Sequence, residues 1–278
     1  MNICRICGYR GEFKKYNVEE MMYKTGESFT YIHCPVCDCL QIKDVPANLG
    51  EYYKDNYYSF DERDGAKCDA KKQEVQYRIL DVGCGSGDFL CALAKQGMTE
   101  LYGCDPFVAK DIEYENGVKI YKKNIHEMQG EYDVIFMNDS FEHVTDPHEV
   151  MESAYRLLSG AGVLRIDIPV FPNIAFEMFG TYWYQLDAPR HIFLHSEKSM
   201  HYLADKHGFY IREATWDSNN SQIVRSFLYS KGIPFVEQTQ EIFEEFFTEE
   251  EMNELQRNSE FANDNKVGDH ALFVLAKK

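Results

Sequence analysis

The fold is decided by the stretch Ile79-Leu80-Asp81-Val82-Gly83-Cys84-Gly85-Ser86-Gly87-Asp88-Phe89-Leu90. A short apolar run breaks into glycines at every second position and then becomes apolar again, which predicts a strand, a tight turn and the start of a helix. The glycines permit positive φ angles and let a ligand approach the backbone closely. The helix that follows offers free N–H groups to a carboxylate or phosphate. The stretch therefore predicts a ligand site at a strand–helix turn.

A second acidic residue strengthens this interpretation. Leu101-Tyr102-Gly103-Cys104-Asp105 is a short apolar run that ends in a carboxylate. It lies about 20 residues after the glycines, the usual offset for a carboxylate that binds ribose hydroxyls. The G-x-G-x-G spacing differs from the G-x-G-x-x-G pattern of dinucleotide enzymes, and Asp81 to Gly87 resembles the first motif of class I S-adenosylmethionine-dependent methyltransferases.

Further matches extend this resemblance over most of residues 78–215. Tyr132 to Asp139 resembles the fourth strand of the family, and Phe141 to Pro147 resembles the loop after it. Before the fifth strand the family has a Lys-Pro-Gly turn, which is Ser159-Gly160-Ala161-Gly162 here. The resemblance implies that S-adenosylmethionine is bound by Asp81, Gly83, Cys84, Gly85, Gly87, Asp105, Pro106, Asn124, Ile125 and Asn138.

From residue 76 onward, apolar runs alternate with helical patterns, which predicts an α/β fold. We expect a doubly wound, mostly parallel, seven-stranded sheet of the Rossmann-like methyltransferase type. The predicted strands are 78–82, 101–105, 118–121, 132–137, 162–168, 209–216 and 270–276. The predicted helices are 87–96, 107–113, 147–158 and 196–207.

The length, composition and net charge of the chain limit its size class, its partners and its expected location. The chain has 278 residues, 44% of them hydrophobic, enough for one α/β core and a smaller module. Its net charge of −17 argues against nucleic acid or an anionic membrane as a partner. We find neither a long apolar run nor a signal peptide, so a cytoplasmic location is expected, and a homodimer is left open.

Two cysteine pairs mark the N-terminal module. Cys4-x-x-Cys7 and Cys34-x-x-Cys37 can present four thiolates to one zinc ion, a saturated and therefore structural site. Cys39 is then a spare thiol, and a redox dithiol is the alternative interpretation. We expect a zinc-ribbon-like module over residues 1–60, a linker over 61–75 and the methyltransferase domain over 76–278.

The methyltransferase domain carries an expected helical insertion at residues 221–262. Ile242, Phe243, Phe246 and Phe247 recur there at helical spacing among glutamates. The simplest expectation is an apolar face that packs on the domain, with the glutamates in solvent. A dimer interface or a substrate lid is the alternative.

Methyl transfer to oxygen or carbon requires a base, and histidine is the first candidate. His143 follows the fourth strand and His191 follows the fifth, and both are predicted as catalytic, with a purely structural histidine as the alternative. Asp139-x-x-Glu142-His143 also resembles the acidic cluster of ubiquinone-biosynthesis O-methyltransferases, which implies a divalent cation.

The acceptor is expected to be a small molecule. Six aromatic residues follow the fifth strand, where such enzymes build an acceptor pocket, although core packing explains half of them: Phe171, Phe176, Phe179, Tyr182, Trp183 and Tyr184. An N-terminal zinc module before the domain resembles deoxysugar C-methyltransferases, which implies a nucleotide sugar or glycan precursor. The alternatives are a quinone or phenol O-methyltransferase, a non-catalytic cofactor-binding subunit and an NAD-linked oxidoreductase.

Overall fold

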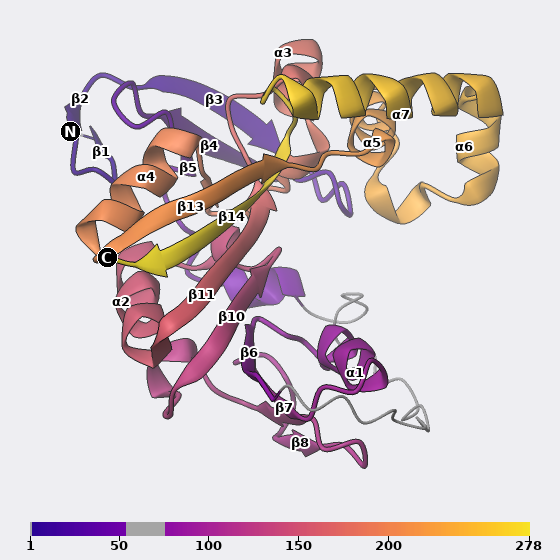
Figure 1. Cartoon of the computed structure of the whole chain (residues 1–278). Helices are drawn as coiled ribbons and strands as arrows, with labels where there is room; N and C mark the ends of the chain where they lie inside the picture. The colour runs from indigo at the N-terminus through magenta and orange to yellow at the C-terminus, as the bar shows by residue number, and fades with distance from the viewer. Residues whose placement is uncertain (1, 54–75) are drawn as a thin grey trace. The chain divides into compact units, whose positions relative to one another are not determined.

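The glycine turn follows one strand of a large sheet whose strands are mostly parallel (Figure 1). The computed structural model describes residues 2–53 and 76–278. The predicted linker 61–75, and residues 54–60 of the predicted module, lie outside the described residues. Within the part that is described, no helix combines the length and apolar character needed to cross a bilayer.

The sheet confirms the predicted fold class and adds one short strand. The pairs from β11 to β9 are parallel, and β8 is antiparallel to β9. In order across the sheet, the strands are β13 (Phe209–Trp216), β14 (His270–Lys277), β11 (Leu158–Pro169), β10 (Tyr132–Asn138), β6 (Arg78–Val82), β7 (Glu100–Cys104), β9 (Lys119–Tyr121) and β8 (Ile112–Glu113). The seven predicted strands are therefore present, and β8 is the eighth.

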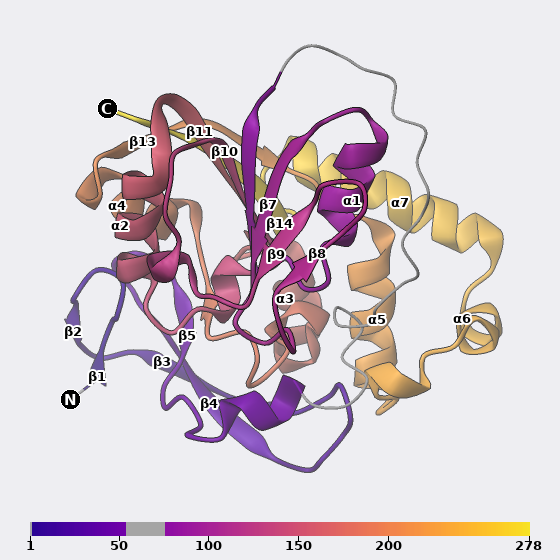
Figure 2. The ribbon, with the colours of Figure 1, turned by 90° about the horizontal axis from the view of Figure 1, so that it is seen from below.

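Helices cover both faces of this sheet, with α1 (Asp88–Lys95) on one side and α2 (Pro147–Leu157) on the other (Figures 1 and 2). Helix α2 begins where the Asp146 carboxylate accepts from two backbone N–H groups and proline occupies the first turn. Together with α4 (Glu197–Lys206), these helices confirm three of the four predicted helices.

The fourth predicted helix, 107–113, is wrong. Residues of this segment make hydrogen bonds to β9 and to Lys122 after it, instead of the hydrogen bonds of a helical turn. The Asp111 carboxylate accepts from the backbone N–H of Lys122 at 2.8 Å, and Ile112 pairs with Ile120. The segment therefore becomes a turn that leads into β8.

One hydrophobic cluster joins α1 to the sheet. Gly103 lets the two approach, because an added Cβ there would lie 2.5 Å from Sγ of Cys84 and 3.0 Å from Leu90. The cluster consists of Ile79, Leu90, Ala94, Leu101, Val108, Val118 and Ile120. This packing fixes the first turn of α1, and with it the glycine turn, against the ends of β6 and β7.

The chain divides into two compact units, each described here by itself. Unit 2 contains the described parts of Tyr53–Asp167, Leu203–Glu213 and Phe273–Lys278. Unit 1 contains the described parts of Met1–Tyr52, Ile168–Tyr202 and Ala214–Leu272. The N-terminal residues thus form one unit with later segments of the chain, a grouping that the predicted boundary at residue 60 does not include.

Unit 1 is built on a four-stranded antiparallel sheet (Figure 2). Its order is β12 (Phe193–Leu194), β5 (Leu40–Ile42), β4 (Ser28–His33) and β3 (Lys14–Glu19). A separate two-stranded hairpin, β1 (Asn2–Ile3) and β2 (Arg10–Gly11), surrounds the first cysteine pair. Strand β12 comes from the middle of the chain, so the small sheet is completed by residues distant in sequence.

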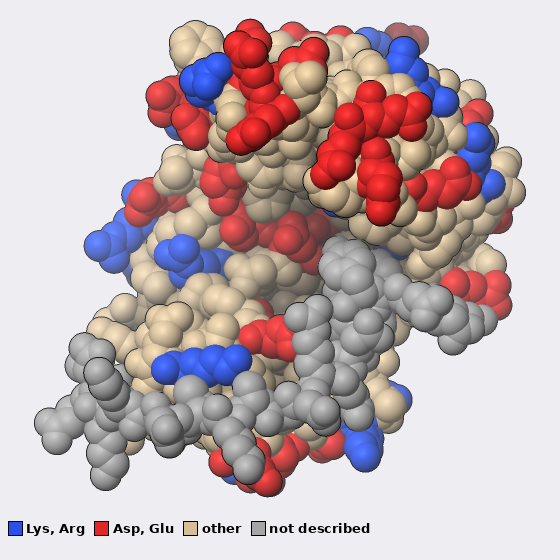
Figure 3. All heavy atoms as spheres, turned by 90° about the vertical axis from the view of Figure 1, so that its right-hand side faces the viewer, with Lys and Arg blue, Asp and Glu red and all other residues tan. Residues whose placement is uncertain are grey.

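The insertion forms three helices rather than one. They are α5 (Asn220–Ser230), α6 (Gln240–Phe246) and α7 (Glu249–Asp264). The rings of Phe246 and Phe247 lie 5.9 and 5.2 Å from the ring of Phe227 on α5, so the apolar stripe packs inside unit 1. The glutamates of α6 and α7 are exposed, as expected, and form the acidic patch in the upper part of Figure 3.

The remaining short elements are α3 (Ile174–Phe179) and the 3-10 helices η1 (Leu49–Tyr53), η3 (Ile125–Glu127), η4 (Phe141–His143), η5 (Gly180–Tyr182), η6 (Tyr184–Leu186) and η7 (Phe235–Glu237).

Candidate functional site

The glycine turn has the backbone that its sequence predicts. Gly83, Gly85 and Gly87 have φ angles of 76°, 51° and 90°, in the left-handed region that favours glycine. A Cβ on Gly83 would lie 2.5 Å from Cβ of Ser140, and one on Gly87 would lie 2.7 Å from Cδ1 of Ile120. The turn is therefore too closely packed to accept side chains, and α1 begins directly after it.

Two carboxylates lie beside this turn. Asp81 is in β6 and Asp105 follows the adjacent parallel strand β7. Asp105 accepts from the backbone N–H of Gly85 at 3.1 Å and from that of Phe107 at 2.8 Å. Burial raises the pKa of Asp81 to about 8, and the charge of Asp105 adds to this rise. Burial also raises the pKa of Asp105, although the two N–H groups oppose the rise. The turn thus places two buried carboxyl groups side by side, of which Asp81 holds its proton at neutral pH in the absence of a ligand.

Other predicted cofactor residues surround the turn or follow neighbouring strands. Cys84 is within the turn, and burial raises the pKa of its thiol. Asn138 ends β10, two residues before Ser140, whose hydroxyl donates to the carbonyl of Val82 at 2.8 Å. Pro106 is exposed directly after Asp105.

Asn124 and Ile125 lie at the start of η3. The side chain of Asn124 is exposed and its backbone N–H donates to Glu127 at 2.9 Å, whereas Ile125 is buried. The contacts of Asn124 with Glu127 cap this turn, which follows β9.

In unit 2, Tyr53 lies beside His143, and Phe107 lies beside Tyr53. Nδ1 of His143 lies 3.1 Å from the hydroxyl of Tyr53, and Nε2 lies 3.7 Å from the buried carboxylate of Glu142. The Tyr53 ring stacks on that of Phe107, with centroids 5.2 Å apart. The aromatic density of residues 52–60 predicts a segment, Tyr53 included, that packs between the modules or over the ligand pocket, with a core-facing connector as the alternative. Phe107 was not predicted as a site residue.

The predicted cation set of Asp139, Glu142 and His143 does not form in the described part of unit 2. Asp139 is exposed and has a φ of 43°, whereas Glu142 is fully buried. The three side chains do not come together as a group of ligand atoms.

The four predicted zinc ligands do come together in unit 1. Cys4, Cys7, Cys34 and Cys37 have all their sulfur atoms within 4.8 Å of one another. The distances Cys4–Cys37 and Cys7–Cys34 are each 3.6 Å. Zinc–sulfur bonds of about 2.3 Å place tetrahedral sulfurs about 3.8 Å apart, whereas a disulfide needs about 2.05 Å. The sulfur positions therefore fit a tetrahedral metal, and Cys39 stays outside the set.

The two cysteine pairs sit on matching turns. The N–H of Gly8 donates to the carbonyl of Cys4 at 2.9 Å, and that of Asp38 donates to the carbonyl of Cys34 at 3.0 Å. Gly8 and Asp38 both have positive φ, 77° and 55°. Four thiolates within 4.8 Å of one another repel, so a cation is needed for all four to be ionised. The chemistry of the donor set thus fits zinc.

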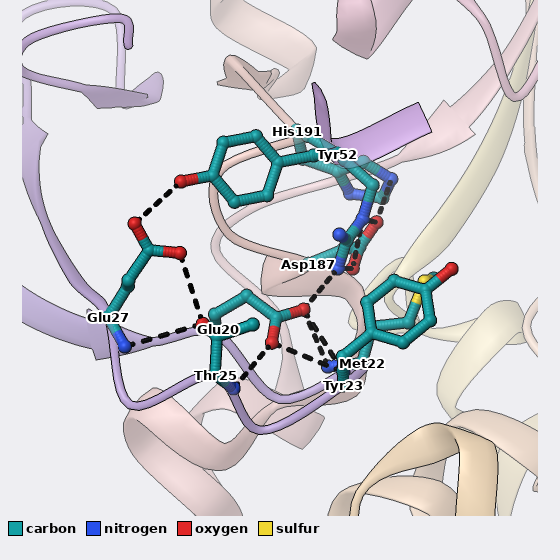
Figure 4. A network of polar contacts seen from close by, with 9 residues as sticks. Glu20, Met22, Tyr23, Thr25, Glu27, Tyr52, Asp187 and His191 are labelled. Atoms are coloured by element: carbon teal, nitrogen blue, oxygen red, sulfur yellow. Dashed lines mark hydrogen bonds and ion pairs between the residues drawn. The ribbon is translucent and has the colours of Figure 1, made fainter. Parts of the chain in front are cut away.

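His191, the second predicted base, lies in unit 1 and His143 in unit 2. Nδ1 of His191 lies 2.7 Å from the carbonyl oxygen of Gln185. Its Nε2 lies 3.9 Å from the carboxylate of Asp187 (Figure 4). A carbonyl oxygen only accepts, so Nδ1 carries the proton and Nε2 is the basic nitrogen of the neutral ring.

A fully buried arginine supports this region. Arg190 donates to both oxygens of Asp187 at 2.6–3.0 Å and to Glu20 at 2.9 Å. Burial opposes the charge of Arg190, but the carboxylates outweigh it and raise its pKa. Glu20 in turn accepts backbone N–H groups of Met22, Tyr23 and Thr25, as Figure 4 shows. Asp187 is expected from the sequence as the polar end of the aromatic set that follows the fifth strand, whereas Arg190 and Glu20 were not predicted. A buried ion pair 170 residues apart has no local sequence signal.

The aromatic side chains after the fifth strand differ in how far they are buried. Phe171 and Trp183 are buried, and Nε1 of Trp183 donates to Asp269 at 2.8 Å. The rings of Phe171, Phe176 and Trp183 pack edge to face in series. Tyr182 is exposed. A cavity of about 10 Å³, the space of one water, is lined by Trp183, Asp187 and Tyr229 among others. Core packing accounts for the buried members.

Comparison with known proteins decides the family. The model of the family described as "Methyltransferase domain" matches residues 55–214, more than half of the chain. The chain belongs to this family. The methyltransferase class expected from the glycine turn is thereby confirmed.

Curated relatives match a shorter part of this methyltransferase. It is 35% identical over 96 residues to the ubiquinone biosynthesis O-methyltransferase of Pseudomonas savastanoi pv. phaseolicola, covering 31% of this chain and 41% of that protein. The Pseudomonas aeruginosa protein of the same name is 33% identical over the same shares. The chain thus spans about two fifths of the length of the curated relatives it matches.

Solved structures are similar at lower identity. The O-methyltransferase of a trans-AT PKS multienzyme of Brevibacillus brevis, in complex with S-adenosyl-L-homocysteine, is 17% identical with a TM-score of 0.44, covering 73% of this chain and 67% of that one. The cyclopropane synthase MmaA2 of Mycobacterium tuberculosis is 16% identical with a TM-score of 0.45, covering 76% and 80%.

Proposed function

We propose that the protein transfers a methyl group from S-adenosylmethionine to a small-molecule acceptor. The observation that carries this proposal is the pair of buried carboxylates, Asp81 and Asp105, beside the glycine turn. No Lys or Arg occurs from residue 79 to 94. Two carboxyl groups with no Lys or Arg at residues 79–94 favour a cationic ligand over the pyrophosphate of NAD, and the sulfonium and ammonium groups of S-adenosylmethionine can replace the proton that Asp81 holds.

The residues of unit 2 bind and orient this cofactor. Asp105 accepts hydrogen bonds from the ribose hydroxyls, while the N–H of Gly85 fixes its carboxylate. Asp81 faces the positively charged part, and the bare glycine backbone lets the ligand approach. The remaining contacts come from Gly83, Cys84, Gly87, Pro106, Asn124, Ile125 and Asn138. Bound S-adenosylmethionine supplies an electrophilic methyl group, so the protein contributes alignment and exclusion of water.

His191 is the proposed base for the acceptor. Its Nδ1–H bond to Gln185 leaves Nε2 to take the proton of an acceptor hydroxyl or acidic C–H. His143 is the second candidate, because its ring is held beside Glu142 in the unit that contains the glycine turn. For the acceptor we propose a nucleotide sugar or glycan precursor, methylated on carbon or oxygen.

A quinone or phenol acceptor is the second candidate. It is favoured by the identity to ubiquinone biosynthesis O-methyltransferases over 96 residues. Of the three expected cation ligands, Glu142 and His143 lie together in the described structure, and Asp139 does not join them.

Zinc at the four cysteines, a cytoplasmic location and the partners also remain proposals. Zinc is supported by the sulfur spacing. We expect no nucleic-acid or membrane partner, and a homodimer is the open alternative to a monomer.

Two measurements test the function. Calorimetry with S-adenosylhomocysteine and with NAD should show binding of the first alone; the reverse result would favour an oxidoreductase. Mass spectrometry should then show a gain of one CH₂ on a compound from a panel of nucleotide sugars and catechols. Binding without any product from a wide metabolite extract would indicate a non-catalytic cofactor-binding subunit.

A further inference from the structure

We propose that the four-cysteine module is the positioning element for His191, so that the metal site controls the orientation of the catalytic base. The proposal rests on the proposed function of His191 and on zinc as the metal. All of the contacts that carry it lie within unit 1. They join the module to residues 187–196, here called the histidine segment.

Two residues of the histidine segment form a strand in the small sheet of the four-cysteine module. Phe193 and Leu194 form β12, which pairs with Gln41 and Leu40 of β5. The N–H of Ile42 donates to the carbonyl of Ile192 at 3.0 Å. This strand starts two residues after His191, so the edge of the sheet fixes the backbone that carries the imidazole.

Each cysteine turn also contacts the segment or its neighbouring strand. Arg5, between Cys4 and Cys7, donates to the side chain of Gln41 at 3.0 Å and lies 4.4 Å above the ring of Phe193. In the second turn, the carbonyl of Cys37 accepts a hydrogen bond from the hydroxyl of Ser196. The four sulfur atoms therefore close two turns that contact the segment at Phe193 and at Ser196.

Two further contacts reach His191 and the residue before it. The buried hydroxyl of Tyr31, on β4, donates to the carbonyl of His191 at 2.6 Å. Arg190 donates to Glu20, which follows β3 directly. Tyr31 is thus a positioning residue three places before Cys34, and its effect on His191 passes through the backbone.

The mechanism follows from these contacts. Zinc ties the turn that contains Arg5 to the turn between β4 and β5. Without the metal the thiolates repel one another and both turns become more mobile. Strand β12 is then held less firmly against β5. The ring of His191 then loses its fixed bond to Gln185, while the glycine turn of unit 2 keeps its own contacts.

The experiment compares the zinc-loaded full chain with the same protein after chelation. Hydrogen exchange should accelerate at least tenfold at Ile42, whose N–H donates to Ile192 across this edge, and nitrogen NMR of His191 should lose the Nδ1–H tautomer. The affinity for S-adenosylhomocysteine should stay within twofold. Unchanged exchange and an unchanged tautomer after removal of the metal, or a purified protein that takes up no zinc, would overturn the proposal.

A point variant keeps the test valid if chelation unfolds unit 1. Tyr31→Phe retains all four cysteines and removes one hydroxyl, so zinc should stay bound while the His191 tautomer signal changes and kcat falls about tenfold at unchanged KM. Tyr16→Phe is the matched control, because Tyr16 pairs with Tyr31 across the sheet but packs its ring on Phe176. Equal tautomer signals in both variants and wild type would contradict the proposal.

The outcomes separate this inference from the proposed function. If exchange and tautomer respond to zinc but no methyl transfer is found, the positioning holds and the function is wrong. If methyl transfer proceeds equally with and without zinc, the function holds and the positioning is wrong.

Discussion

The glycine turn of unit 2 and the histidine segment of unit 1 are built in opposite ways. At the turn, residues 81–87 take their conformation from neighbouring residues and from glycine φ angles between 51° and 90°. The histidine segment is held by partners about 150 to 170 residues away in sequence, including Tyr31 and Glu20. One region is a local motif, and the other is assembled only by tertiary structure.

This difference separates two tasks. The glycine turn offers backbone and carboxylates to a cofactor. The φ angles of its own glycines set its shape, and Asp105 and Ser140 bond to it from the neighbouring strands. His191 has a single basic nitrogen because a carbonyl fixes its tautomer. His143 contacts a hydroxyl, which can donate or accept, so its tautomer is not fixed in the same way. The comparison predicts that damage to one region affects binding and damage to the other affects turnover.

The largest expected effect is that of His191→Ala. Removal of a general base costs about 10²- to 10⁴-fold in kcat, and we expect this loss with the acceptor identified by mass spectrometry. Calorimetry should show unchanged affinity for S-adenosylhomocysteine. His143→Ala is the control and should lose less than tenfold. If the losses are reversed, His143 is the base, and the division of tasks between the regions fails.

Gly87→Ala should produce the next effect, on binding and stability together. Gly87 has a φ of 90°, and a Cβ would lie 2.7 Å from Ile120. We expect a loss of about 2–3 kcal/mol in the free energy of unfolding by urea, from backbone strain and the clash. Affinity for S-adenosylhomocysteine should fall with it.

Gly117→Ala is the matched control for Gly87→Ala. Gly117 has a similar φ of 88°, but nothing lies within 4 Å of its added Cβ, so it isolates the backbone cost of about 1 kcal/mol. Equal losses in the two variants would show that the turn is not closely packed.

How much the sequence could predict follows from the same comparison. Asp81, the three glycines and Asp105 could be located because strand, turn and helix start are local, and the carboxyl ends of adjacent parallel strands meet. The four cysteines could be paired because metal ligands have a characteristic spacing. Both predictions rest on patterns only a few residues long.

The remainder depends on contacts that no short pattern records. Tyr53 beside His143, and Arg190 between Glu20 and Asp187, join residues 90 and 170 positions apart. The predicted helix 107–113 fails because Asp111 and Ile112 bind the next strand instead of their own turn. In each case tertiary contacts override local propensity.

A smaller effect is expected for Asp105→Asn. The carboxylate is proposed to accept from the ribose, and a hydrogen bond to a charged group contributes about 1.5–3 kcal/mol. Affinity for S-adenosylhomocysteine should therefore fall about 10- to 100-fold by calorimetry. Asp88→Asn is the control, because it removes an exposed carboxylate at the start of α1 and should change affinity less than threefold. Similar losses in both variants would mean that net charge, rather than contact with the ribose, governs binding.

The last prediction concerns the pH dependence of the free energy of unfolding and its origin in Asp81. Folded Asp81 keeps its proton up to about pH 8 because it is buried, whereas an ordinary Asp loses it near pH 3.8. Between these values the folded state binds one proton more than the unfolded state, so the free energy of unfolding falls as pH rises, by about 1.4 kcal/mol per unit. This stabilisation is complete below pH 3.8 and is lost as pH rises through 8.

In Asp81→Asn this contribution disappears, because the amide does not titrate. Urea unfolding of the ligand-free protein between pH 5 and 7.5 should therefore show a flatter pH dependence in the variant, whereas Asp88→Asn should keep the wild-type slope. A slope that Asp81→Asn leaves unchanged would mean that Asp81 is already ionised in the folded protein. The glycine turn would then carry a fixed charge before the cofactor binds, and a cationic ligand would bind without the release of a proton.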